Sequence, residues 1–227
     1  MPKPIRSPQE VETVKNDILT TALKLMCDDG FDALSMRKLA ARLKMTAANI
    51  YNYYENKDDL YLAIQTRGFQ MLVDRFESIY SSDQPTREKL HAMMHAYLKF
   101  GIGNPDYYEI MFSRNTPKYA DYKGTPMEPT AFIEKQTALK VSEITTRTIM
   151  ALYDENEAIS EAEALYRTIV VWSTLHGVVN LFNSRVLQEV EEASEELIDR
   201  LFKDLMEIAI KPKDEYKKNM HLAGGRQ

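Results

Sequence analysis

The chain contains few of the residues on which disulfides, metal centres and nucleotide sites depend. Its 227 residues include a single cysteine, Cys27, and only eight glycines. One cysteine cannot form an internal disulfide and suits a reducing compartment, so a cytoplasmic location is expected. The sequence has no glycine-rich phosphate loop. No apolar run approaches roughly eighteen residues, and residues 1–16 lack the apolar core of a secretory signal. We therefore expect neither a membrane span nor a cofactor.

The sequence also lacks a recognisable catalytic or metal-binding motif. His91 and His95 stand at i and i+4, a spacing that metal sites use on helices, but no cysteine or acidic partner follows at motif spacing. We interpret them as a surface pair and expect no bound metal. Cys27 lies on the apolar side of a predicted helix and has no obvious activating histidine, so we interpret it as a buried, inert thiol. An enzyme is therefore not expected.

Composition and periodicity favour a helical globular protein. Apolar residues make up 44% of the chain and charged residues 28%, a balance that allows a substantial core in one or two domains. Apolar residues recur at helical spacing, and no strand-like alternation of useful length is present, so we predict an all-α fold. The longer predicted elements cover residues 8–29, 57–80, 87–101, 106–113, 130–156, 160–185 and 194–210, with a loop over 117–129.

Residues 31–60 carry the most specific pattern in the chain. Ser35, Thr46 and Asn56 each occupy the position of a helix N-cap, where a side-chain oxygen accepts from exposed backbone N–H groups. Apolar residues flank the first two caps at the positions of a hydrophobic staple. Three helix starts so close together predict short helices that meet at sharp angles. This is the geometry of a helix-turn-helix, which points to DNA.

The second of these short helices has two distinct faces. Ile50 and Tyr54 are spaced to face inward, and the opposite side presents Ala48, Asn49 and Asn52. A small residue permits close approach to a major groove, and an asparagine amide can bond base edges. This face is therefore predicted to read DNA.

The charge distribution supports attraction to phosphate. Between Ser35 and Lys57 there are five basic residues and one acidic residue, a net charge of +4. Because the whole chain carries −5, the residues outside this window carry −9. A local positive patch on an acidic protein favours DNA at one site and opposes loose binding elsewhere. The five basic residues are Arg37, Lys38, Arg42, Lys44 and Lys57.

Residues 18–64, read without a gap, resemble the DNA-binding domain of the tetracycline-repressor (TetR) family of bacterial transcription regulators. The resemblance is carried by the Gly30-Phe31 break, the run that begins at Ser35, the Ile50-Tyr51 pair and Lys57. It implies that Arg37 and residues 47–49 lie near base edges, and that Thr46, Tyr51, Tyr53 and Lys57 contact phosphates. The complete predicted DNA-binding set is Ser35, Arg37, Lys44, Thr46, Ala47, Ala48, Asn49, Tyr51, Asn52, Tyr53 and Lys57.

Lys44 departs from the family pattern, which commonly has glycine at this position of the turn. A lysine there is predicted to adopt a left-handed conformation at some cost in strain, and its side chain is a candidate phosphate contact. Lys57 allows two interpretations, either a phosphate contact at a helix N-terminus or a solvated lysine beside Asp58 and Asp59. The basic arm Lys3 to Arg6 either enters a minor groove or frays.

The last two long helices suggest a homodimer. Their wide apolar stripes either form the monomer core or pair with a second copy, and the TetR resemblance favours pairing through a four-helix bundle. The stretch Trp172 to Gly177 also resembles a C-terminal domain type of this family, and close helix contact would explain Gly177 within a helix. The predicted interface comprises Leu175, Val179, Phe182, Leu197, Leu201, Phe202 and Leu205.

Aromatic and methionine side chains in the middle of the chain either line an effector pocket or form ordinary core. The TetR resemblance implies a pocket for a small apolar or aromatic molecule among these helices. The candidate lining residues are Tyr97, Phe100, Tyr107, Met111, Phe112, Phe132, Trp172 and His176.

Three functional hypotheses follow for the chain. The leading one is a dimeric repressor that binds double-stranded DNA at a palindromic operator and is released by a small-molecule effector. The second is a DNA-binding activator or adaptor that needs no effector. The third is a helical ligand-binding scaffold with an inactive helix-turn-helix. We expect a DNA-binding domain over residues 1–60, a regulatory and dimerisation domain over 61–212 and a tail over 213–227.

Overall fold

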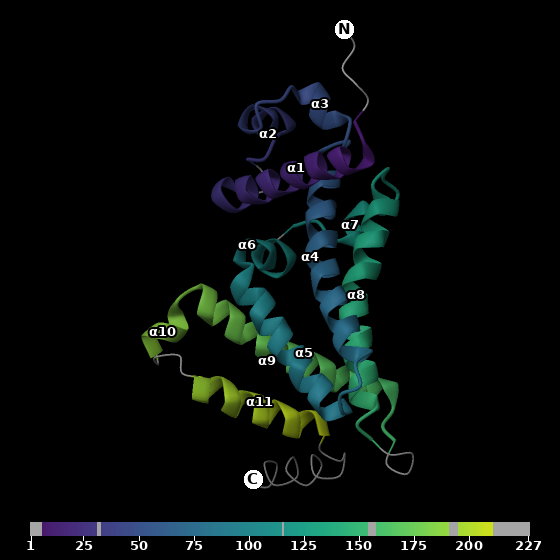
Figure 1. Ribbon diagram of the computed structural model, residues 1–227, viewed down its shortest axis with the longest axis vertical. Helices are drawn as coiled ribbons and strands as arrows, with labels where there is room; N and C mark the ends of the chain where they lie inside the picture. The colour runs from purple at the N-terminus through teal and green to yellow at the C-terminus, as the bar shows by residue number, and fades with distance from the viewer. Residues whose placement is uncertain (1–5, 31–32, 115, 154–157, 191–194, 211–227) are drawn as a thin grey trace, which may run out of the picture. The chain divides into compact units, whose positions relative to one another are not determined.

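A computed structural model describes residues 6–30, 33–114, 116–153, 158–190 and 195–210 (Figure 1). This described part of the chain is helical and contains no strand, which confirms the predicted all-α fold. The elements are α1 (Pro8–Asp29), α2 (Met36–Arg42), α3 (Ala47–Tyr51), α4 (Lys57–Tyr80), α5 (Thr86–Gly103), α6 (Pro105–Tyr108), the π-helix η1 (Glu109–Ser113), α7 (Tyr119–Tyr122), α8 (Glu128–Met150), α9 (Glu161–Asn183), α10 (Val186–Val190) and α11 (Glu195–Ile210).

The bounds of α1 and α4 agree with the predicted ones, two other predictions need correction, and one short helix was not predicted. The predicted loop over 117–129 contains α7 and the start of α8, because the Asp121 carboxylate accepts from the Lys118 backbone N–H at 2.7 Å and supports a single helical turn. The predicted helix over 130–156 ends at Met150, and the short helix α10 was not expected. The predicted tail, residues 213–227, lies outside the described residues.

The chain divides into two compact units. Unit 1 comprises residues 1–71 and 104–139, and unit 2 comprises residues 72–103 and 140–227, so the divisions fall within α4 and α8. The domain boundary after residue 60 stays a prediction. The elements that carry the predicted DNA-binding residues, α2, α3 and the start of α4, all belong to unit 1.

Helix α1 contributes much of the core of unit 1. Its N-terminus is closed by a capping box between Ser7 and Glu10. Its buried side chains Ile18 and Ala22 belong to the same apolar cluster as Leu39 of α2 and Ile50 of α3. Figure 1 shows α2 and α3 beside one another along α1, and both α1 and α3 contact α2. A single small core thus fixes the helix-turn-helix.

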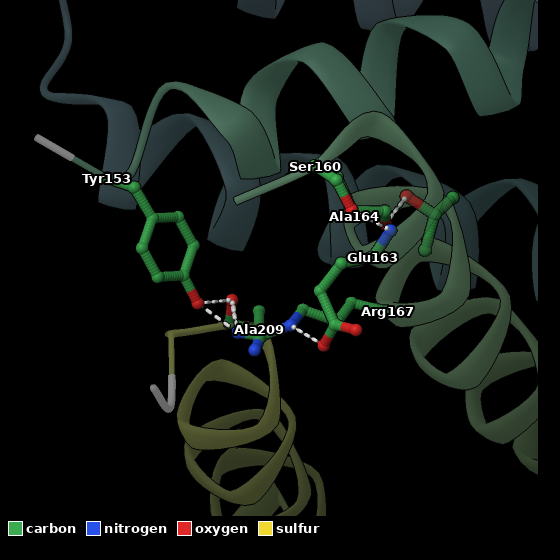
Figure 2. Close-up of polar contacts among 7 residues, drawn as sticks. Tyr153, Ser160, Glu163, Ala164, Arg167 and Ala209 are labelled. Atoms are coloured by element: carbon green, nitrogen blue, oxygen red, sulfur yellow. Dashed lines mark hydrogen bonds and ion pairs between the residues drawn. The ribbon is translucent and has the colours of Figure 1, made fainter. Parts of the chain in front are cut away.

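Unit 2 is built around α5, α9 and α11, which pack against one another. Arg167 is buried, and Figure 2 shows its side chain beside Ala209, at the C-terminal end of α11. Arg167 Nη1 donates to the Ala209 carbonyl at 3.1 Å, and Arg167 Nε lies 3.0 Å from the Glu163 carboxylate. The Tyr153 hydroxyl also donates to the Ala209 carbonyl, at 2.9 Å. A cation and a hydroxyl at a helix C-terminus satisfy carbonyls that would otherwise lack partners, so these contacts hold α11 against α9.

Candidate nucleic-acid interface

The three predicted N-caps are confirmed by their hydrogen bonds. Ser35 Oγ accepts from the Lys38 N–H at 3.2 Å, and Thr46 Oγ1 accepts from the Asn49 N–H at 3.2 Å. Asn56 Oδ1 accepts from the N–H of Asp59 at 2.9 Å. These side-chain bonds satisfy backbone donors at each helix start, and they fix where α2, α3 and α4 begin.

The turn between α2 and α3 contains the left-handed lysine that the sequence predicted. Lys44 has a φ of 54°. Its neighbour Met45 donates its backbone N–H to the Ala40 carbonyl at 2.9 Å, which closes the end of α2. The side chain of Lys44 is exposed, so its ammonium is available to a phosphate.

Replacing Lys44 by glycine is expected to stabilise the fold by about 0.5–1 kcal/mol, because relief of left-handed strain exceeds the added entropy of the unfolded chain. Urea unfolding measures this difference. Lys44→Ala is the matched control, since it removes the charge and keeps the strained backbone. Both variants should weaken DNA binding equally, and equal stability of the two would contradict the strain argument.

Helix α3 and the residues that follow it have the buried side and the exposed side that their spacing predicted. Ile50 and Tyr54 are buried in unit 1. Ala48 and Asn52 are exposed, and Tyr51 is 54% exposed. Around them, Thr46 is exposed, whereas Ala47, Asn49 and Tyr53 are half-buried. Small and amide side chains are thus exposed on one side of a helix whose other side is buried, a surface of the kind that a major groove accepts.

The positive charges of the helix-turn-helix are unevenly available. Arg37, Arg42 and Lys44 are exposed. Lys38 Nζ lies 2.7 Å from the Asp29 carboxylate, so the charge of Lys38 already has a partner. The sequence count missed this pairing, because Asp29 belongs to another helix and lies outside the counted window.

An arginine outside the predicted set contacts one of the predicted residues. The guanidinium of Arg6 donates to the Tyr53 hydroxyl and lies 6.0 Å from the centre of the Tyr53 ring. This contact joins the residue before the α1 N-cap to the segment that follows α3. Arg6 belongs to the basic arm, Lys3 to Arg6, that the sequence singled out. Lys3 of that arm lies outside the described residues.

The predicted effector-pocket residues of unit 2 lie close together. Trp172 Nε1 of α9 donates to the hydroxyl of Tyr97 of α5 at 2.8 Å. The His176 ring is centred 6.3 Å from that of Trp172, and its Nε2 lies 2.8 Å from Asn180 Nδ2. Phe100 and Tyr97 are buried, and burial lowers the pKa of His176. Tyr97, Trp172, His176 and Asn180 thus form a polar–aromatic cluster that joins α5 to α9.

The other predicted pocket residues belong to unit 1 and fall into two places. Phe112 packs edge-on against Phe69 at a ring separation of 5.5 Å, close to Tyr107 and Met111 in the chain. Phe132 is 47% exposed on α8 and lies 5.9 Å from the Tyr119 ring. The eight residues therefore divide between two units, and a common pocket stays a prediction.

Four of the seven residues predicted for the dimer interface are buried within the chain. Leu175, Val179, Phe202 and Leu205 are buried within unit 2, so these side chains pack inside the chain itself. The other three predicted residues, Phe182, Leu197 and Leu201, are half-buried. Helical spacing reported the stripe correctly but could not say whether the chain or a second copy covers it.

Helix α9 exposes several large apolar side chains that were not part of the predicted interface. Its large side chains Leu165, Tyr166, Ile169 and Trp172 are all exposed, and Ile169 is 47% exposed. A Cβ added at Gly177 would meet no heavy atom of the described chain within 4 Å. The close contact expected at Gly177 is thus not found within the described residues.

The histidine pair lies at the surface as predicted, whereas Cys27 is half-buried and not fully buried as predicted. His91 and His95 are exposed, and both rings pack against Phe202, at 5.3 Å and 4.3 Å. No cluster of three metal-ligating side chains occurs among the residues that the structure describes. Burial raises the pKa of the half-buried Cys27 thiol to about 12, which makes it a poor nucleophile.

Within the described ranges, none of the helices is both long and apolar enough to cross a bilayer.

Comparison with known proteins agrees with this arrangement. Residues 18–64 match the model of the family described as bacterial regulatory proteins, tetR family, and residues 90–205 match that described as tetracyclin repressor-like, C-terminal domain. The chain is 23% identical over 188 residues to an uncharacterized HTH-type transcriptional regulator of Bacillus subtilis, YobS, covering 81% of this chain and 84% of that protein.

Two solved structures share the fold. A TetR family transcription regulator from Marinobacter aquaeolei has a TM-score of 0.64 at 18% identity, with 89% of this chain and 98% of that chain covered. AibR, crystallised in complex with isovaleryl coenzyme A and operator DNA, has a TM-score of 0.61 at 16% identity, with 87% and 98% covered.

Proposed function

Because the chain belongs to the tetracycline-repressor family of DNA-binding transcriptional regulators, we propose that it is a dimeric repressor released from a palindromic operator by a small apolar or aromatic effector. The observation that carries the DNA-binding half is the capped helix α3, with Ala48 and Asn52 exposed opposite the buried Ile50. A helix fixed in this way enters a major groove as a rigid body.

The proposed operator contacts divide into two groups. Arg37, Asn49 and Asn52 supply the donors and acceptors that distinguish base edges. Thr46, Tyr51, Tyr53, Lys44 and Lys57 contact phosphates and set the register, and Ser35 holds the start of α2. Since Ala47 and Ala48 cannot form side-chain hydrogen bonds, part of the specificity rests on DNA shape.

The proposed dimer uses the outer face of α9. Exposed apolar side chains at Leu165, Tyr166 and Ile169 lie on one side of the helix, and contiguous exposed apolar patches commonly mark protein interfaces. A two-fold axis through such a face presents two identical recognition helices, which matches a palindrome. The half-buried Leu197 and Leu201 of α11 are candidates for its edge.

The proposed effector site lies at the cluster of Tyr97, Phe100, Trp172 and His176 in unit 2. Aromatic side chains with a few polar atoms suit a ligand that is mainly apolar, and a structure of the same fold holds an acyl coenzyme A together with operator DNA. Binding must differ in affinity between two conformations to release DNA. His176 is the proposed polar contact.

The test is protection of the DNA next to the chain's own gene, at near-physiological salt and in excess nonspecific DNA, with wild type and Arg37→Ala in parallel. Phosphate attraction alone gives dissociation constants of about 10⁻⁴–10⁻⁶ M. We expect a protected palindrome at nanomolar protein that Arg37→Ala loses. Sequence-blind binding by both proteins, also after selection from random DNA, would instead identify an inactive helix-turn-helix.

The same DNA fragment then separates a repressor with an effector from a regulator without one. Release of the protected palindrome by an apolar or aromatic compound, together with a rise in the thermal midpoint, is the expected result. An operator complex that resists every such compound would favour the effector-independent alternative.

A further inference from the structure

The C-terminal end of α1 is electrostatically unfavourable when taken by itself. The last turn of α1 contains Asp28 and Asp29 and no basic residue. The carbonyl groups at a helix C-terminus already carry partial negative charge, so carboxylates there are repelled and cations are attracted. This end of α1 therefore depends on positive charge from other parts of the chain.

Two segments that are far apart in the sequence supply that charge. Lys38 of α2 pairs with the Asp29 carboxylate at 2.7 Å. Arg114, which directly follows η1, donates from Nη2 to the Cys27 carbonyl at 3.0 Å. The α1 end thus joins α2 of the helix-turn-helix to the segment after η1, and all of these residues belong to unit 1.

The π-helix fixes the position of Arg114. The Arg114 backbone N–H donates to the Glu109 carbonyl at 3.0 Å, the five-residue step of a π-helix. The Arg114 side chain also pairs with Glu109, with Nε 2.9 Å and Nη2 2.8 Å from the same carboxylate oxygen. A change from π to α register would shift Arg114 by one residue relative to Glu109 and carry its guanidinium away from Cys27.

A close packing contact holds η1 in place against α4. A Cβ added at Gly68 would lie 2.4 Å from Met111 Sδ and 3.1 Å from Tyr107 Cδ1, so side chains of η1 and α6 pack closely against α4 at this glycine. Both α6 and η1 also contact α1. The main chain of Arg114 is therefore held by η1, and its guanidinium donates to the Cys27 carbonyl at the end of α1.

We propose that Arg114 is a positioning residue for operator recognition, which holds the end of α1, and through the Asp29–Lys38 pair the start of α2, in the DNA-reading arrangement. It contacts no predicted DNA residue and acts through the main chain of α1. The inference rests on the proposed function, specific DNA binding by this chain. It adds that the π-helical register of η1 controls this binding, because that register sets the position of Arg114.

The experiment compares wild type, Arg114→Gln and Arg114→Lys in the full chain. Fluorescence anisotropy is measured on an operator obtained by selection from random DNA and on a scrambled duplex of equal length. Arg114→Gln should lower operator affinity about tenfold, the size expected for one charge-assisted hydrogen bond, and leave scrambled-duplex affinity within about twofold. Arg114→Lys keeps a donor for Cys27 and should recover most of the discrimination. The charge-matched control is Arg87→Gln, at an exposed position near the start of α5, which should leave both affinities unchanged.

Hydrogen exchange over residues 26–30 gives a second readout that needs no DNA. The Gly30 N–H donates to the Met26 carbonyl at 3.0 Å at this helix end, and its exchange should be faster in Arg114→Gln and near wild type in Arg114→Lys. An unchanged ratio of operator to scrambled affinity in Arg114→Gln, or unchanged exchange, would overturn the proposal. If wild type itself does not discriminate the operator, the repressor function fails, and the exchange comparison alone decides whether Arg114 holds α1.

Discussion

Ile169→Lys is expected to convert the protein from a dimer to a folded monomer and to weaken operator binding about 10²–10⁴-fold. Ile169 is 47% exposed on the outer face of α9, so a lysine there is solvated in the monomer and costs little stability. In the proposed dimer, the same ammonium would be buried between two apolar helix faces. The loss of operator affinity follows because two linked recognition helices bind far more tightly than one.

Light scattering after size exclusion measures the mass, and anisotropy on the operator measures the affinity. Ile133→Lys is the matched control, since Ile133 is a 59% exposed isoleucine on α8. It should leave both the dimer and DNA binding unchanged. A dimer that survives Ile169→Lys and dissociates with Ile133→Lys would move the interface from α9 to α8.

Local features of the sequence predicted the helix-turn-helix well. Ser35, Thr46 and Asn56 cap helices through bonds to backbone groups three residues away, and such contacts depend little on the rest of the fold. The left-handed Lys44 followed from a single departure within a known turn. Where the physical cause lies within a few residues, the sequence was sufficient.

Contacts between distant segments could not be predicted in the same way. Nothing in the spacing of Arg114 indicates that it reaches Cys27, because the π-helical step at Glu109 sets its direction. The sequence also could not predict what covers an apolar helix stripe, because the stripe has the same period whether it packs inside the chain or against a second copy. Val179 and Phe202 of the predicted interface are accordingly fully buried within unit 2.

Ala48→Asp is expected to abolish operator binding, with a loss of at least about 100-fold, while the fold remains intact. Ala48 is exposed at the start of α3, where an aspartate is tolerated and is favoured by the helix dipole. In the complex, the same carboxylate would face the major groove, where its charge meets phosphates and its bulk prevents close approach. Anisotropy on the selected operator and on a scrambled duplex measures the loss, and urea unfolding establishes that the fold is retained.

Gln136→Asp provides the control for charge alone. Gln136 is exposed on α8, also in unit 1, and its substitution adds the same single negative charge. Salt then separates the two parts of the effect, because phosphate repulsion weakens as ionic strength rises and a steric clash does not. Ala48→Asp should remain defective at every salt concentration at which wild type still binds. Operator binding within about threefold of wild type would show that the exposed face of α3 does not enter the groove, and the DNA-reading surface would then have to include another part of the helix-turn-helix.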